Sequence, residues 1–348
     1  MTGAPQPFVS VVVPCRNEER YIGPCLESIV TSDYPHDKME VLVADGRSQD
    51  ATREVVARYA AAHPWVHLLD NPAQITPVGL NRAIRLAQGE VIVRMDAHVE
   101  YPPDYISRSV AALRESGADN VGGVIVTRPA DRTATARAIA LGLSHPFGVG
   151  NSYFRIGTRH RRWVDTVAFG CFRREVFEQI GLFDEDLVRN QDDELNARLI
   201  RHGGRILLAP EIVSYYYARG SLRHLWRMYY QYGLFKPLAA QRAGGFVTVR
   251  QLVPPAFLLV LLGLGLVGAW WRPAGILCGA VAGTYLAAIF GCAGHAARTH
   301  GVKTALALVL VFPVLHFSYA LGFLRGLVDR MRRSKGRTRA PAAVSLSR

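Results

Sequence analysis

The first 220 residues alternate between short apolar runs and segments in which apolar residues recur with helical spacing. Four of the apolar runs are strand-like: FVSVVVP, MEVLVAD, WVHLL and EVIVRMD. Each of the first three is followed by an amphipathic segment. This alternation predicts βα units, which place parallel strands in one sheet with helices on both faces. We therefore expect an α/β fold for residues 1–220.

The C-terminal part is apolar over much longer stretches. Three segments lack Asp, Glu, Lys and Arg: residues 253–271, 274–294 and 304–324. Each is about 20 residues long, the length with which a helix crosses the hydrocarbon core of a bilayer. Three such runs in succession favour transmembrane helices over buried helices of a soluble core. Trp270 and Trp271, at the end of the first segment, suit a membrane interface.

Two further segments flank these apolar runs. Residues 221–250 include SLRHLWRMYYQYGLFK, where aromatic and basic residues are mixed. That mixture suits an amphipathic helix in the headgroup layer, although packing on the soluble domain is equally compatible. Residues 326–348 are strongly basic and are expected to be disordered. The predicted organisation is thus a cytosolic domain (1–220), an interfacial segment (221–250), a membrane region (251–325) and this tail.

Membrane topology follows from the basic tail. Three crossings would place it on the side opposite to the N-terminal domain, whereas the positive-inside rule favours the cytosol. We therefore expect an even number of crossings. Pro313 and His316 lie in the middle of the third apolar segment, which is the one that we expect to be re-entrant or interfacial.

Composition narrows the choice of partners. The chain has 348 residues and a formal net charge of +13, which fits nucleic acid, anionic lipid or a phosphorylated substrate. The basic residues concentrate near the apolar segments and form no nucleic-acid motif, so nucleic acid is not expected. The five cysteines are scattered, which predicts reduced thiols. No secretory signal is visible, so we expect the N-terminal domain in the cytosol.

Acidic residues follow three of the predicted strands. Glu18 comes after the first strand, Asp45 after the second and Asp96 after the fourth. In open α/β sheets, ligands bind beyond the carboxyl ends of the strands, so these carboxylates are expected at one binding edge. The G-x-G-x-x-G fingerprint of dinucleotide-binding folds is missing, which makes that class a weak alternative.

Four stretches together resemble the family 2 glycosyltransferases, whose catalytic domain has the GT-A fold. They are VVVPCRNEERYI, VLVADGRSQDAT, VIVRMDAHVEYP and GLFDEDLVRNQDDELNARLIRHGGRI. They occur in the order and at the spacing of that family and cover about residues 8–210. DAH, NQDDELNARL and SYYYARGSLRHLWRMYYQYG look most like the membrane-bound glucosyltransferases of bacterial exopolysaccharide assembly, such as that of succinoglycan.

The resemblance implies a nucleoside diphosphate sugar donor, usually linked to UDP. In the family, the positions that line the base and ribose correspond to Pro14, Arg16, Glu18 and Asp45. Carboxylates suit this role because they accept hydrogen bonds from uracil N–H and ribose hydroxyl groups.

Asp96 and His98 match the metal motif of the family, with His98 in place of a second Asp. A divalent cation would neutralise the departing diphosphate, and an imidazole ligand favours Mn²⁺ over Mg²⁺. The alternative is that His98 only forms a hydrogen bond. Many relatives have a further His where this chain has Tyr216, so water or diphosphate oxygens are expected to complete the metal shell.

The resemblance places the general base in NQDDELNARL. In register, Asp192 takes the catalytic position, and Asp193 is the rival candidate. The alternative is an acidic helix N-terminus favoured by the helix dipole, and Glu194 and Arg198 fit an ordinary helical ion pair. One base without a carboxylate nucleophile implies a single displacement with inversion, by analogy with inverting hydrolases.

The acceptor side is less defined. VAFGCFRREVF resembles the acceptor segment of the family, and Gly170 would permit close approach of substrate. Basic residues near the predicted membrane surface could bind the diphosphate of a polyprenyl-linked acceptor: Arg219, Arg227 and Lys236. General attraction to anionic lipid explains any one of them equally well.

These features predict an inverting, metal-dependent glycosyltransferase on the cytoplasmic face of the inner membrane. It would transfer one hexose, with glucose expected, from a UDP-sugar to a polyprenyl-diphosphate-linked saccharide, with a polysaccharide assembly complex as a further partner. A processive synthase is the first alternative, although the Q-x-x-R-W motif is absent. A non-catalytic membrane scaffold with a nucleotide-sugar-binding fold is the second.

Overall fold

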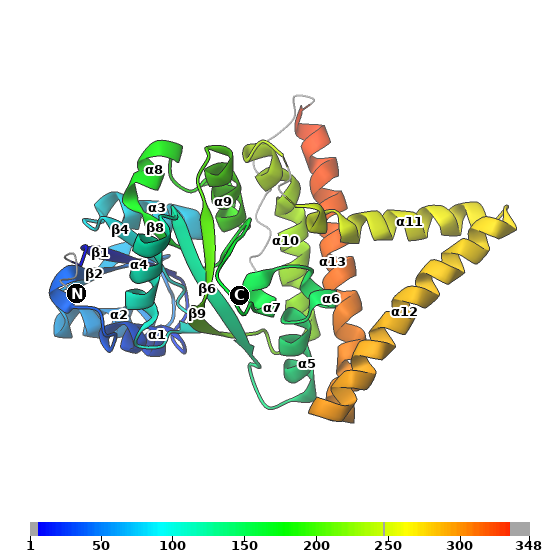
Figure 1. Ribbon diagram of the computed structural model, residues 1–348, viewed down its shortest axis with the longest axis horizontal. Coiled ribbons are helices and arrows are strands. Elements are labelled where there is room, and N and C mark those ends of the chain that lie inside the picture. Colours follow the sequence, from blue (N-terminus) through cyan, green and yellow to red (C-terminus); the bar gives the residue numbers. More distant parts are fainter. Residues whose placement is uncertain (1–5, 246–247, 335–348) are drawn as a thin grey trace. The chain divides into compact units, whose positions relative to one another are not determined.

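The computed structural model describes residues 6–245 and 248–334 (Figure 1). The chain divides into two compact units. An α/β unit comprises Met1–Val126 and Tyr153–Tyr217, and a helical unit comprises Thr127–Ser152 and Ala218–Arg348. Residues 127–152, which the sequence pattern groups with the N-terminal domain, thus cluster with the C-terminal helices.

One mixed, mostly parallel sheet forms the centre of the α/β unit, as the sequence predicts. Its strands are β1 (Val9–Cys15), β2 (Met39–Asp45), β3 (Val66–Asp70), β4 (Val91–Arg94), β5 (Val99–Glu100), β6 (Asn120–Arg128), β7 (Arg162–Trp163), β8 (Cys171–Arg173) and β9 (Ile206–Tyr217). Their order is β3-β2-β1-β4-β8-β6-β9-β5, with β7 paired to β9. The pairs β1–β2, β1–β4 and β2–β3 are parallel, whereas β8 is antiparallel to β4 and β6.

Helices cover this sheet. They are α1 (Ile22–Val30), α2 (Thr52–Ala62), α3 (Thr76–Leu86), α4 (Tyr105–Ser116), α7 (Tyr153–Ile156), α8 (Arg174–Ile180) and α9 (Gln191–Arg201), with a 3₁₀ turn η1 (His36–Lys38). Every residue of β2 is buried, and so is every residue of β1 except Pro14. Burial on both faces explains why these strands read as continuous apolar runs instead of alternating ones.

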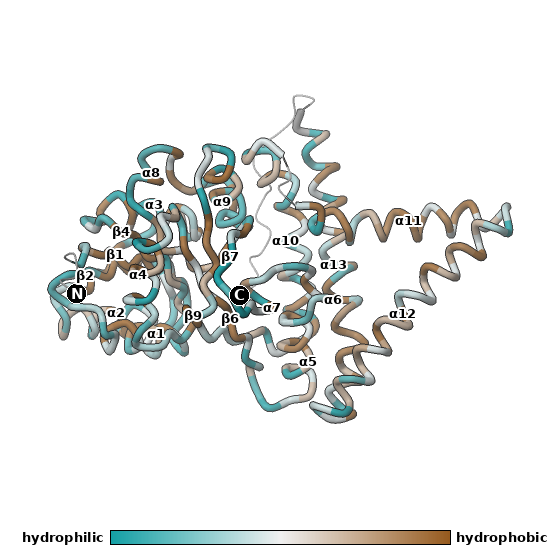
Figure 2. The backbone as a smooth tube through the Cα atoms, viewed as in Figure 1, coloured by the Kyte–Doolittle hydropathy of each residue, from teal (hydrophilic) through white to brown (hydrophobic). Residues whose placement is uncertain are grey.

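The helical unit contains the three apolar segments. Its elements are α5 (Ala134–Leu143), α6 (Pro146–Val149), α10 (Leu222–Arg242), η2 (Val249–Gln251), α11 (Val253–Gly268), α12 (Arg272–His300) and α13 (Val302–Ser334). Figure 2 shows α11, α12 and much of α13 as hydrophobic. Large apolar side chains on them are exposed, among them Leu262, Leu266, Ile276 and Phe290, and so is Trp270 between α11 and α12.

By length and composition, α12 and α13 could each cross a membrane. The first apolar segment forms only a 16-residue helix, α11. We expect the third segment to be re-entrant or interfacial around Pro313, but α13 is one helix of 33 residues that continues through this proline, which contradicts a re-entrant turn there. The segment that falls short of a typical spanning length is therefore the first and not the third.

α10 packs against α13 at glycine positions. A Cβ atom on Gly322 would lie 2.1 Å from the carbonyl oxygen of Tyr230, and one on Gly326 would lie 2.3 Å from that of Leu234. These distances leave no room for a side chain, so the two helix backbones are in direct contact. Trp226 and Arg227, near the start of α10, remain exposed. The predicted position of α10 at a membrane interface stays a prediction.

Candidate active site

Neighbouring parallel strands bring the predicted acidic residues to one edge of the sheet. Cys15 at the end of β1 pairs with Asp45 at the end of β2, and Val12 pairs with Arg94 at the end of β4. Glu18 and Asp96 follow within a few residues of β1 and β4. The carboxyl edge of β2, β1 and β4 therefore carries the predicted donor-binding residues.

Asp96 and His98 form an ion pair within the Asp-Ala-His motif. His98 Nδ1 lies 3.0 Å from Asp96 Oδ1 and 3.5 Å from Glu18 Oε1. Burial by itself lowers the pKa of His98, but the charges of Asp96 and Glu18 outweigh this effect and raise it to about 9. For Asp96 the effects have the opposite signs. Burial by itself raises the pKa of Asp96, but the charges of His98 and Arg94 hold this pKa well below its usual range.

This pair fits two neighbouring ligands of one divalent cation. Ligands at 2.0–2.1 Å in octahedral geometry lie about 3 Å apart when they are adjacent, close to the 3.0 Å separation of Asp96 Oδ1 and His98 Nδ1. Within residues 6–245 and 248–334, however, no group of three His, Cys, Asp or Glu side chains is arranged for a metal. The ring of Tyr216 lies 5.5 Å from that of His98, where many relatives would place a further His.

Arg94 is a site residue that the motifs missed. Its side chain is 6% exposed, and its Nη2 lies 3.1 Å from Asp96 Oδ2 and 3.7 Å from Asp192 Oδ2. The guanidinium also lies over the ring of Phe169, 5.0 Å from its centroid. A charged residue inside an otherwise apolar strand, as in VIVR, was the sequence signal that could have identified it.

Asp192 lies in the first turn of α9, with its side chain about one third exposed. Burial raises the pKa of Asp192; Arg94 opposes this rise, whereas Asp193 and Asp96 add to it. Arg94 thus brings the predicted base and the predicted metal motif together, although they come from distant parts of the sequence.

The other acidic residues of α9 are held by different partners. Asp193 Oδ1 accepts a hydrogen bond from the Thr166 hydroxyl at 3.3 Å. Glu194 is 2% exposed and pairs with Arg198 at 2.8 Å, one helical turn later. Glu194 and Arg198 therefore form the ordinary helical ion pair that their spacing suggests.

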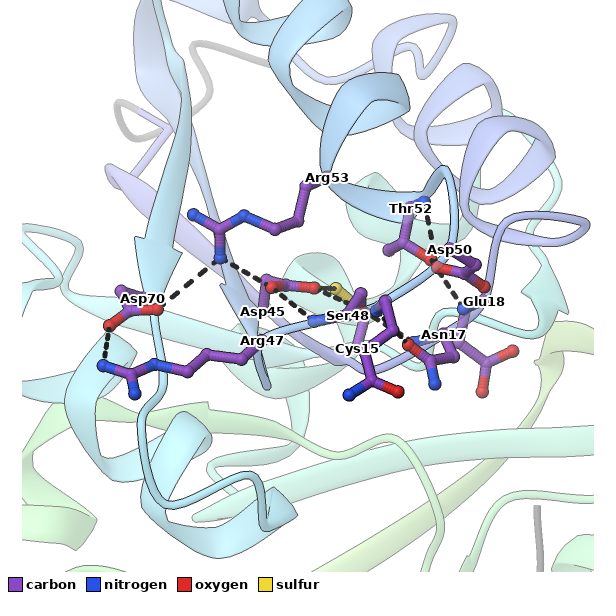
Figure 3. Close-up of polar contacts among 11 residues, drawn as sticks. Cys15, Asn17, Glu18, Asp45, Arg47, Ser48, Asp50, Thr52, Arg53 and Asp70 are labelled. Carbon is purple, nitrogen blue, oxygen red and sulfur yellow. Dashed lines mark hydrogen bonds and ion pairs between the residues drawn. The ribbon is translucent and has the colours of Figure 1, made fainter.

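Asp45 lies at the predicted edge, but its side chain is fully buried, and Figure 3 shows its polar contacts. Oδ2 accepts from Ser48 N at 3.1 Å and from Arg53 Nη1 at 2.7 Å. Oδ1 accepts from the Ser48 hydroxyl and lies 3.8 Å from Cys15 Sγ. A carboxylate has about four acceptor positions, so in this arrangement the protein itself uses those of Asp45. Contact with a nucleobase would require one of these partners to move.

The loops after β1 and β2 hold each other in place (Figure 3). Backbone N–H groups of Asn17 and Glu18 donate to the hydroxyls of Ser48 and Thr52, both at 2.7 Å. Arg16 packs against the second loop, because a Cβ atom on Gly46 would lie 3.2 Å from its Cδ. Its buried Nε has no hydrogen-bond partner among the described residues. Pro14 is half-buried in β1.

The predicted acceptor residues are divided between the two units. Gly170 belongs to the α/β unit, where an added Cβ would lie 2.4 Å from Asn120 Oδ1. Packing against Asn120 therefore requires a glycine there whether or not substrate approaches. Arg219, Arg227 and Lys236 belong to the helical unit, in which Arg227 is exposed and Lys236 is 6% exposed. Their contact with an acceptor stays a prediction.

This chain belongs to glycosyltransferase family 2, and it is an enzyme of that family. Residues 10–181 match the family described as "Glycosyl transferase family 2". The chain is 31% identical to the succinoglycan biosynthesis protein ExoA of Rhizobium meliloti (strain 1021), over 93% of this chain and 96% of that protein. The fold class and the family expected from the motifs are thereby confirmed.

Other similar proteins act on lipid-linked sugars or bind nucleotide sugars, according to their names. A Methanococcus voltae dolichyl N-acetyl-α-D-glucosaminyl phosphate 3-β-D-2,3-diacetamido-2,3-dideoxy-β-D-glucuronosyltransferase is 27% identical, over 92% of this chain and 97% of that one. A Pyrobaculum calidifontis mannosyltransferase, solved with GDP-Man and Mn²⁺, has a TM-score of 0.59 and 23% identity, over 93% of this chain and 88% of that one. Residues 1–349 of S. aureus TarS, solved with UDP, have a TM-score of 0.50 and 17% identity, over 95% of this chain and 93% of that one.

Proposed function

We propose that this protein is an inverting, metal-dependent glycosyltransferase that moves one hexose, glucose, from a UDP-sugar to a polyprenyl-diphosphate-linked saccharide. The observation that carries the proposal is the joint contact of Arg94 with Asp96 and Asp192. It gathers a donor-side carboxylate and a candidate base at the strand edge where α/β folds bind ligands.

On the donor side, Asp96 and His98 would hold a divalent cation. When bound, the cation would neutralise the charge that develops on the departing diphosphate. The Mn²⁺ and GDP-Man of the mannosyltransferase with the same fold support this assignment. The imidazole ligand favours Mn²⁺ over Mg²⁺. Glu18 and Arg16, at the edge of the same site, would contact the nucleoside.

On the acceptor side, Asp192 would accept the proton of the attacking hydroxyl. The hydroxyl oxygen forms a bond to the anomeric carbon while the bond to the nucleoside diphosphate breaks, and the electron pair of that bond leaves with the diphosphate. A single displacement of this kind inverts the anomeric centre, so an α-linked donor gives a β-glycoside. Asp192 suits the role better than Asp193, because Thr166 holds Asp193.

The acceptor and the location are inferred from the helical unit and the relatives. ExoA takes its name from succinoglycan, and the Methanococcus enzyme from a dolichyl phosphate-linked sugar. α12 and α13 would cross the inner membrane, and α11 would not. Two crossings keep the basic end of α13, with Arg325, Arg330 and Arg332, on the cytoplasmic side with the α/β unit, as the positive-inside rule favours.

The proposal is tested with the full chain in detergent and lipid extract as the acceptor source. UDP release is measured with UDP-glucose, UDP-N-acetylglucosamine and GDP-mannose, with Mn²⁺ or with EDTA. We expect release from UDP-glucose with Mn²⁺ and none with EDTA. No turnover of any donor, together with UDP binding that ignores the metal, would contradict the proposal. Turnover of GDP-mannose alone would replace the donor but keep the reaction class.

A further inference from the structure

Arg94 occupies an unusual position for a charged residue. It ends β4, an inner strand that pairs with β1 on one side and β8 on the other. Its neighbours in the strand are Val91, Ile92 and Val93, all buried, and Arg94 itself is 5% exposed. Burying a guanidinium is costly unless specific partners compensate, so the partners of Arg94 identify the reason for its presence.

Those partners are the two carboxylates that the proposed function uses. Within the described residues, Nη2 of Arg94 approaches a carboxylate oxygen of Asp96 and one of Asp192. Its Nε is buried and has no hydrogen-bond partner there. The ring of Phe169 below the guanidinium limits its orientation.

Arg198, an arginine of the same unit, has partners of a different kind from those of Arg94. Arg198 pairs with Glu194 on its own helix and also donates to the carbonyl oxygens of Ile180 and Leu182. Those bonds tie α9 to the end of α8 and to the loop that follows it. Arg94 instead joins the strand that precedes the donor motif to the helix that carries the candidate base. It therefore links the two groups to which the proposed function assigns the donor side and the acceptor side.

We propose that Arg94 is a positioning residue for the transfer step, acting through Asp192 and Asp96. This inference rests on the proposed function. Without Arg94, the Asp192 carboxylate would lose its cationic partner and would turn away from the reacting hydroxyl. Asp96 would keep His98 as a partner at 3.0 Å. Loss of Arg94 should therefore reduce kcat far more than it weakens donor binding.

The first experiment compares Arg94→Met and Arg94→Lys with Arg198→Met as the matched control. We expect Arg94→Met to lower kcat about 100-fold, the cost typical of a misplaced reacting group, with the Kd for UDP in Mn²⁺ changed by no more than about threefold. Because Nη2 approaches both carboxylates, a compact ammonium there would restore the positive charge, and the Lys variant should recover at least about tenfold of the lost kcat. Arg198→Met should lower the melting temperature without separating kcat from UDP affinity.

Two results would overturn the inference. One is a proportional loss of kcat and UDP affinity in both Arg94 variants, which a general structural role predicts. The other is a kcat close to that of the wild type in Arg94→Lys and in Arg94→Met. If Arg94→Met does not fold, Arg94→Lys decides between the same outcomes.

A stability cycle tests the coupling independently of the reaction. Thermal unfolding is measured for four proteins: the wild type, Arg94→Met, Asp192→Asn and the variant that carries both substitutions. We expect Arg94→Met to lower the melting temperature less in the Asp192→Asn background, because the repelling charge has been removed. Equal losses in both backgrounds would contradict the inference. If the wild type turns over no donor while this coupling is present, the proposed function fails but the contact of Arg94 with Asp192 does not.

Discussion

The imidazole Nδ1 of His98 lies 3.0 Å from Oδ1 of Asp96, so the Asp-Ala-His motif forms an ion pair within itself. This geometry makes a direct prediction about metal choice. His98→Asp should preserve transfer and shift the preference from Mn²⁺ toward Mg²⁺, because a carboxylate is the harder ligand. UDP release measured over a series of both metals checks the shift, with His98→Ala as the control for loss of a ligand. An unchanged metal profile in His98→Asp would show that His98 is not a ligand.

The same pair predicts how the stability of the metal-free protein depends on pH. The pKa of His98 is raised from its ordinary 6.5 to about 9. A folded-state pKa above the unfolded value gives stabilisation that is fully present below about pH 6.5 and is lost as the pH rises through about 9. In EDTA, the melting temperature should fall across this range more steeply for the wild type than for His98→Gln. Parallel curves for the two proteins would exclude the pair as the cause.

Asp192 and Asp193 can be separated by substitution. Asp192→Asn should reduce turnover by about 100- to 10,000-fold, the usual contribution of a general base, while UDP binding stays nearly intact. Asp193→Asn should have a smaller effect, because Asp193 accepts a hydrogen bond from Thr166. Donor turnover and UDP calorimetry on both variants decide the assignment. The opposite ranking would make Asp193 the base.

Arg53 and Arg47 are a matched pair for testing the buried carboxylate of Asp45. Arg53→Met leaves Asp45 without its cation and should destabilise the fold by about 1–3 kcal/mol, since Arg53 itself is partly exposed. Arg47 pairs with Asp70, and both side chains are 40% or more exposed, so Arg47→Met should cost no more than about 1 kcal/mol. Thermal unfolding in detergent checks the order. Equal losses would mean that Asp45 does not depend on Arg53.

The contact of α10 with α13 predicts a steric effect at Gly322. Gly322→Ala should destabilise the helical unit by about 1–3 kcal/mol, because the new Cβ would overlap the carbonyl oxygen of Tyr230. Gly279→Ala on α12 is the control, since nothing lies within 4 Å of a Cβ atom there. That variant should be neutral or slightly stabilising, as alanine is the better helix former. Similar melting curves for the two variants would rule out tight packing at Gly322.

Local sequence patterns determined the parallel half of the sheet. β1, β2 and β4 are short runs buried on both faces, and a polar residue follows β1 and forms the last position of β2 and of β4. These features lie within a few neighbouring residues, so apolar runs and helical periodicity reveal them. The antiparallel pairing of β6, β8 and β9 was not predicted. Their pairing joins segments far apart in the chain, and β8 has only three residues.

Tertiary structure alone decided what each site residue contacts. The sequence placed Asp45, Asp96 and Asp192 in motifs, but it did not show that Arg53 and Ser48 occupy the carboxylate of Asp45. Likewise, nothing in the local pattern links Arg94 to Asp192, because one ends a strand and the other begins a helix much later in the chain. A sequence motif shows which side chains lie near the end of a strand. Only the folded chain sets which charges share a buried space, since that depends on packing between distant segments.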